Sequence, residues 1–223
     1  MAQDYQGFVA LHVACYVGNI KLVQILLART PAEALWQTTP GGETCMYFAA
    51  NNGHLVVVQE LMQAGGKRLL KMVNFKKYSC LHVAAFMNHL PLVEYLAREG
   101  GKEFLLGANV EGATCLYMAA REGHLDIVKF LARAGGEELL LRQRSGGLSC
   151  LYIAVQQGHL EVVRFLIAAG GRRLVLITLT NGVSCLFFAA QAGRDDIVRA
   201  LLAAPGGSEL LLAPARRLHQ RAG

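Results

Sequence analysis

The chain repeats itself every 35 residues. Five cysteines mark this period, and each follows a threonine or serine and precedes a leucine or methionine: Cys45, Cys80, Cys115, Cys150 and Cys185. Columns of alanine, valine and leucine recur at the same spacing. A fixed period of this length indicates stacked supersecondary units, because each unit can bury its apolar face only against its neighbours. The repeat therefore predicts a linear array.

The register accommodates six units with no insertion between them. We place a repeat domain at residues 5–215 and a basic, disordered tail at 216–223. The predicted units are 7–40, 41–75, 76–110, 111–145, 146–180 and 181–215. These comparisons lie within one chain, so they indicate a geometry that the units share.

Each unit reads as two helices and a loop. In the fourth unit, Thr114 offers a side-chain oxygen to cap a short helix that ends at Gly123. A second helix follows from residue 125, with apolar residues at helical spacing and Gly135 as its stop. The stretch 136–147 is polar and flanked by glycine, which favours an extended loop with a hairpin turn.

The motifs of the fourth unit resemble those of the ankyrin repeat family. They read Gly112-Ala-Thr114-Cys-Leu116, Ala119-Ala120 and Gly123-His124-Leu125, followed by Val128 and Leu131. The resemblance implies an all-α fold: an ankyrin repeat solenoid of stacked antiparallel helix pairs joined by projecting loops or short β-hairpins. Two departures stand out. Thr/Ser-Cys-Leu replaces the family's Thr-Pro-Leu-His, and the period exceeds the usual length of about 33 residues.

Composition and cysteine usage indicate a protein inside the cell. Hydrophobic residues make up 53% of the chain, yet no stretch reaches the roughly 18 apolar residues that suggest a membrane span. The first residues lack the pattern of a signal peptide. Equivalent cysteines in stacked units should lie about 8–10 Å apart, too far for a disulfide. We expect free thiols and a location in the cytoplasm rather than the nucleus.

The charge of the chain does not favour nucleic-acid binding. The net charge is +6, and three of these positive charges lie in the tail, at Arg216, Arg217 and Arg221. A duplex-binding surface would concentrate lysine and arginine on one face of the folded domain. We therefore expect no nucleic-acid partner.

Recurring histidines raise the question of catalysis or metal binding. His54, His89, His124 and His159 recur at the same period of 35. A metal or nucleophile site requires ligands that converge at one place, whereas four copies along an array indicate bonds to free backbone groups at helix ends. The double glycines lack the Gly-Lys-Ser/Thr of a phosphate-binding loop. We expect no enzyme activity, small-molecule substrate, metal or cofactor.

A surface for a partner protein is the remaining hypothesis. The resemblance implies that partners contact the concave face, at positions beside the first glycine of a unit and after the Ala-Ala pair. In the third unit these positions carry large apolar residues, the profile of an interaction hot spot with a polar surround. The alternative is that Phe86 and Met87 pack against a neighbouring helix and Phe75 fills the base of the loop. The predicted partner-binding residues are Asn51, Asn52, Phe75, Lys76, Tyr78, Phe86, Met87, Arg121 and Glu122.

The sequence thus predicts a protein-interaction module or scaffold without catalysis. One alternative is a regulatory ankyrin segment of a larger enzyme or signalling protein, of which this chain is a fragment. Another is self-association, because neither terminal unit has the polar outer face that ends an array. The identity of the partner and the pathway do not follow from the residues.

Overall fold

The computed structural model describes residues 9–29 and 31–211, and the predicted tail at 216–223 lies outside them. The chain divides into two compact parts, Met1–Val110 and Glu111–Gly223. We call them the first part and the second part. The division falls at the predicted boundary between the third and fourth units.

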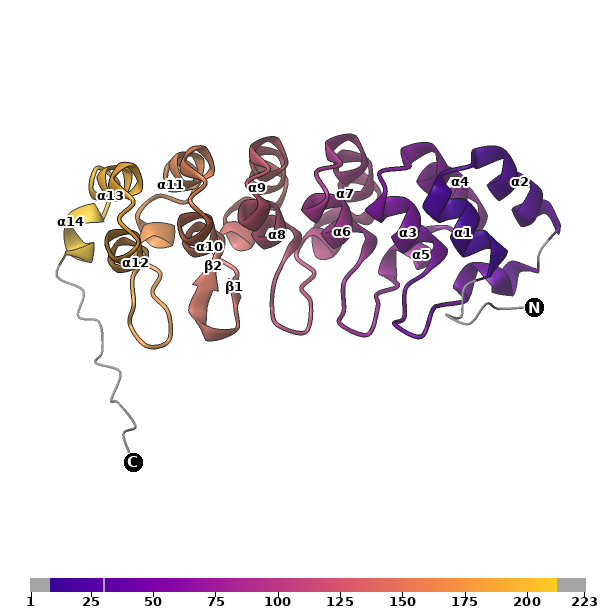
Figure 1. Ribbon diagram of the computed structural model, residues 1–223, viewed down its shortest axis with the longest axis horizontal. Helices are drawn as coiled ribbons and strands as arrows, with labels where there is room; N and C mark the ends of the chain where they lie inside the picture. The colour runs from indigo at the N-terminus through magenta and orange to yellow at the C-terminus, as the bar shows by residue number, and fades with distance from the viewer. Residues whose placement is uncertain (1–8, 30, 212–223) are drawn as a thin grey trace, which may run out of the picture. The chain divides into compact units, whose positions relative to one another are not determined.

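The first part consists of stacked helix pairs. Its helices α1, α3 and α6 pack side by side, and α2 contacts α4 in a second row (Figure 1). The short α5 contacts both α4 and α7. The elements are α1 (Ala10–Val17), α2 (Ile20–Arg29), the 3-10 helix η1 (Ala32–Trp36), α3 (Cys45–Asn51), α4 (Leu55–Gly65), α5 (Lys67–Lys71), α6 (Cys80–Phe86) and α7 (Leu90–Leu105).

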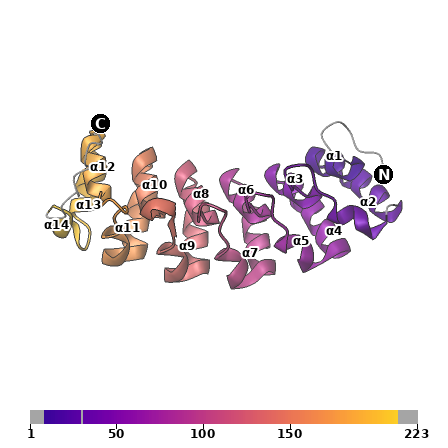
Figure 2. The same cartoon turned by 90° about the horizontal axis from the view of Figure 1, so that it is seen from below.

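The second part repeats the same plan. Figure 2 shows α8, α10 and α12 in one row and α9, α11 and α13 in the other. The helices are α8 (Cys115–Glu122), α9 (Leu125–Leu140), α10 (Cys150–Gln157), α11 (Leu160–Val175), α12 (Cys185–Gln191), α13 (Asp195–Leu202) and α14 (Gly207–Leu210). A hairpin of β1 (Gln143–Arg144), the 3-10 turn η2 (Ser145–Gly147) and β2 (Leu148–Ser149) precedes α10.

Hydroxyl side chains begin the first helix of five units. The Thr114 hydroxyl oxygen accepts a hydrogen bond from the Tyr117 backbone N–H at 3.2 Å, which satisfies one of the unpaired donors of the first helical turn. The cap predicted at Thr114 and the helix end at Gly123 are confirmed. The same bond forms at Thr44, Ser79, Ser149 and Ser184.

The extended loop predicted for residues 136–147 is wrong in its first part. The backbone leaves the helical region at Gly136, where φ is 63° and ψ is −159°, but residues up to Leu140 return to helix. Leu139 and Leu140 are buried, and burial of this leucine pair favours a further helical turn after the glycine. The hairpin turn of the same stretch is present as β1 and β2.

The second helix of a unit contributes fully buried side chains to the core. One leucine column, at Leu61, Leu96, Leu131, Leu166 and Leu201, is fully buried. Six free cysteines are buried among the first helices, as the sequence predicted for the five that recur.

Three of the recurring histidines each tie their own unit to the preceding one. The His159 Nε2–H donates to the Arg121 carbonyl oxygen at 2.9 Å, and His54 and His89 make equivalent bonds at 3.0 Å to the carbonyls of Tyr16 and Asn51. These carbonyls lie in the last turns of α1, α3 and α8, where no intrahelical donor is available. The structural role predicted for the histidines is confirmed at these three positions.

The sixth unit replaces this histidine with Arg194, whose Nη2–H donates to the Gln156 carbonyl oxygen at 3.0 Å. We therefore expect His159→Ala to destabilise the second part by about 1–2 kcal/mol, because a helix-end carbonyl loses its donor. His159→Arg should lose less, since arginine makes this bond elsewhere in the chain. Urea midpoints of the two variants would check this. Equal losses for alanine and arginine would contradict the role of the bond.

Candidate partner-binding surface

The third unit, together with Phe75 directly before it, exposes large apolar side chains. Phe75 is 75% exposed, Met87 42% and Phe86 37%. Phe75 lies in the loop before α6, whereas Phe86 and Met87 lie at the end of that helix. Lys76 beside Phe75 is also exposed. Exposed aromatic and methionine side chains are enriched at contact sites for other proteins.

Backbone hydrogen bonds hold the loop of Phe75 in place. The Phe75 N–H donates to the Gly41 carbonyl oxygen at 3.0 Å, and the Val110 N–H donates to that of Lys76 at 3.1 Å. The Asn74 side chain also accepts from the N–H groups of Lys76 and Tyr78. The exposed phenyl ring therefore stands on an ordered loop, which lowers the entropic cost of a contact.

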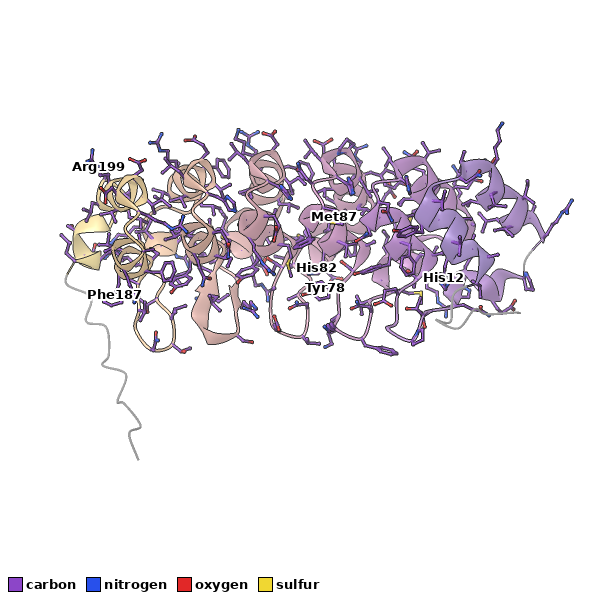
Figure 3. The ribbon with its side chains drawn as sticks, viewed as in Figure 1. His12, Tyr78, His82, Met87, Phe187 and Arg199 are labelled. Atoms are coloured by element: carbon purple, nitrogen blue, oxygen red, sulfur yellow. The ribbon has the colours of Figure 1, made fainter. Side chains whose placement is uncertain are left out.

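Tyr78 combines packing with partial exposure. Its ring meets that of His82 edge to face, with the centroids 5.9 Å apart (Figure 3). Tyr78 as a whole is half-buried. Truncation of Tyr78 would thus disturb packing inside the unit as well as the surface, so it is a poor test of binding.

Asn51 and Asn52 lie at the end of α3, on the preceding unit. The Asn52 side-chain amide donates to the Phe48 carbonyl oxygen at 3.0 Å, so this side chain serves the helix end. Asn51 borders a hollow of about 500 Å³ between α1, α3 and the loop at 39–43. Tyr16 and Phe48 also line this hollow.

The first unit exposes two further apolar side chains, at positions that the resemblance already assigned to the binding face. Tyr16 is 53% exposed and Val17 64% exposed at the end of α1. They occupy the positions in the first unit that Phe86 and Met87 occupy in the third, so the same period that indicates Phe86 and Met87 indicates them. Their exposed area adds a second apolar site to the first part.

Arg121 and Glu122 belong to the second part, at the end of α8. They form an ion pair with each other at 3.4 Å, and both side chains are partly exposed. Such a pair contributes little to stability because water screens it. It remains a predicted contact for a partner.

The described residues show no sign of a reactive cysteine. Burial raises the pKa of the Cys80, Cys115 and Cys150 thiols to about 12. A nucleophilic cysteine requires the opposite shift. Within residues 9–29 and 31–211, no three histidine, cysteine or acidic side chains converge as metal ligands. None of the helices in that same portion is long and apolar enough to cross a membrane.

A model of ankyrin repeats, built as three copies, matches residues 11–104, 67–139, 100–173 and 137–211. The chain belongs to the ankyrin repeat family. The resemblance in the sequence motifs is thereby confirmed, as is the all-α fold of stacked helix pairs. Ankyrin repeats are generally protein-interaction modules, and the exposed apolar side chains described above lie on such repeats.

Two relatives that share one name each match a stretch of 74 residues. SMC5-SMC6 complex localization factor protein 1 of Bos taurus is 39% identical over 74 residues. The Homo sapiens protein of the same name is also 39% identical over 74 residues. The matched stretch is 33% of this chain and 7% of each relative. The chain thus spans a small fraction of the length of these relatives.

Proposed function

We propose that this ankyrin repeat protein binds another protein through the exposed apolar side chains of its third unit, as an interaction module or scaffold without catalysis. The observation that carries the proposal is the exposure of Phe75, Phe86 and Met87 on an ordered unit. We call these three residues the apolar patch. Lys76, Asn51 and Asn52 would form its polar surround.

The energetics of the patch favour a protein ligand. Burial of a phenylalanine or methionine side chain contributes about 1.5–3 kcal/mol, and the ordered loop of Phe75 limits the entropic cost of binding. Aromatic anchors with a polar rim carry most of the energy in protein interfaces. The hollow lined by Tyr16, Phe48 and Asn51 would extend the contact surface within the first part.

We expect the double variant Phe75→Ala/Met87→Ala to weaken partner binding by at least about 2 kcal/mol, because it removes two anchors. The partner would first be captured from cell lysate on the immobilised wild-type chain. Calorimetry with the purified partner would then give the dissociation constants. Circular dichroism should be unchanged, since both side chains are exposed and not in the core.

Phe187→Ala is the matched control, because Phe187 is 49% exposed in the second part (Figure 3). It removes an apolar ring of the same kind from a different unit. Equal affinity losses in the control and the patch variant would contradict the assignment to the third unit. A captured partner that binds both variants like the wild type would also overturn it.

A second candidate is a regulatory ankyrin segment within a larger enzyme or signalling protein. The relatives support the larger size alone, since the aligned stretch makes up only 7% of their length. Detection of the endogenous protein by antibody would test this, because a mass far above 24.2 kDa would support it.

For the location we propose the cytoplasm, supported by six free buried thiols. Imaging of the endogenous protein would test that.

A further inference from the structure

A cavity of about 380 Å³ lies in the first part, apart from the apolar patch. Its walls come from α5, the loop before α6, the first turn of α6 and the end of α7. Leu70, Val73 and Phe104 supply an apolar lining. The volume falls in the range of small-molecule pockets, which are mostly apolar with a few placed polar groups.

Four residues that line this cavity break the repeat of the chain. Each differs from the residues at the equivalent positions of most other units. His82 stands in the column of Tyr47, Tyr117, Tyr152 and Phe187, in which the first unit carries His12. Phe104 stands in the column of Leu69, Leu139 and Leu174, and Lys71 stands in that of Leu106, Leu141, Leu176 and Leu211. Lys77 stands in the column of Gly42, Gly112, Gly147 and Gly182.

The exchange at His82 explains the open space. Tyr117 and Tyr152 are each 5% exposed and fill the equivalent place in their units. An imidazole is smaller than a phenol, so His82 fills less of this place than Tyr117 and Tyr152 fill in their units. Leu70 and Phe104 line the space that results.

The exchange at Lys77 places a charge there at the expense of backbone strain. Its φ is 60°, and Gly42, Gly112, Gly147 and Gly182 of the same column have φ of 81–86°. A residue with a Cβ is disfavoured in this left-handed region, and strain of this kind concentrates at functional sites. Lys77 lines the cavity in spite of this strain.

Positive charge dominates the rim. Lys67, Lys71 and Lys77 face one acidic residue, Glu103, which gives three positive charges against one negative. Among the described residues, none of the three lysines forms a salt bridge. An anion bound here would gain charge-assisted hydrogen bonds from these ammonium groups.

The buried His82 adds a polar group of fixed orientation. It is 3% exposed, and its Nδ1 accepts from the Ser79 N–H at 3.3 Å. Since Nδ1 is an acceptor, the ring proton of the neutral imidazole lies on Nε2. The cavity thus has apolar walls, one buried imidazole and a lysine rim.

We propose that this cavity binds a small organic anion, with a carboxylate at the lysines and an apolar body against Leu70, Val73 and Phe104. The ligand is bound and not converted. The site is independent of the apolar patch, because Phe75, Phe86 and Met87 do not line it.

The test is calorimetric titration with 2-naphthylacetate and with its neutral counterpart, 2-naphthylacetamide. We expect the acid to bind at least about tenfold more tightly than the amide, since charge-assisted bonds contribute about 1.5–3 kcal/mol. His82→Tyr should abolish binding by filling the space. Lys77→Gly should weaken binding of the acid at least about fivefold.

We expect both variants to fold like the wild type, so that their binding can be compared with it. Each introduces a residue that the same column already holds in other units, so the thermal midpoint should not fall. Lys76→Gly is the matched control, because Lys76 lies in the same loop, carries the same charge and does not line the cavity. It should bind the acid like the wild type.

Several results would overturn the proposal. These are no saturable binding of the acid at millimolar concentration, equal affinity for the acid and the amide, equal losses in the Lys76 and Lys77 variants, or unchanged binding in His82→Tyr. Phe75→Ala/Met87→Ala should bind the acid normally. A failure of protein binding at the apolar patch would therefore leave this result unaffected.

Discussion

Raising the pH from about 8 to about 10 is expected to destabilise the protein by about 3–4 kcal/mol through three buried thiols alone. Cys80, Cys115 and Cys150 are at most 3% exposed. Burial disfavours the thiolate and raises the pKa of each thiol from about 9 to about 12. Each thiol then contributes about 1 kcal/mol to the difference between the two pH values.

The direction of the effect follows from proton binding. Between about pH 9 and pH 12 the unfolded chain has lost these thiol protons, whereas the folded chain retains them. The contribution is therefore complete below the unfolded pKa and is lost as the pH rises toward the folded one. Desolvation also raises the pKa of the Tyr152 phenol, which acts in the same direction.

Guanidinium unfolding at the two pH values, in the presence of reductant, would measure this loss. Cys80→Ala removes one of the three thiols and should reduce the difference by about 1 kcal/mol. Ellman's reagent should leave the native thiols unmodified and react once the chain unfolds. The same pH difference in the variant and the wild type, or rapid labelling of the native protein, would contradict the prediction.

Leu131→Ala is expected to destabilise the second part by about 2–5 kcal/mol, because it leaves a cavity in a packed core. Leu131 is fully buried on α9, and α9 packs against both α8 and α11. Each unit of a repeat array contacts only its neighbours. The loss should therefore concentrate in the helices around α9.

Hydrogen exchange followed residue by residue would measure this, because unfolding of repeat arrays need not be two-state. Protection of α8, α9 and α11 should fall together. Leu202→Ala is the matched control, since Leu202 also belongs to the leucine-rich second helices but is 39% exposed. It should cost less than about 1 kcal/mol. Equal losses in both variants would contradict the prediction.

The sequence alone determined the family, the helix pairs and their caps. The period of 35 residues fixes which positions are equivalent, and the hydroxyl before each recurring cysteine marks where a helix begins. These signals are local or periodic, so they can be read without coordinates. The structural role of His54, His89 and His159 followed from the same repetition.

The helical turn after the double glycine required the tertiary structure. Residues 137–140 are helical because Leu139 and Leu140 are buried, and burial depends on neighbours outside the segment. In the sequence, a glycine pair and two acidic residues precede these leucines, and that beginning favours a loop. Tertiary packing thus overrode the local preference.

The candidate sites also depend partly on the sequence and partly on the tertiary structure. The sequence determined that the third unit carries large apolar residues, but only coordinates give their exposure, from 37% at Phe86 to 75% at Phe75. The cavity at His82 was also beyond the sequence. Lys71, Lys77, His82 and Phe104 are separated along the chain, and they meet because α5, α6 and α7 pack around one space. Periodicity identifies equivalent positions, whereas packing in three dimensions decides which departures from the repeat lie together.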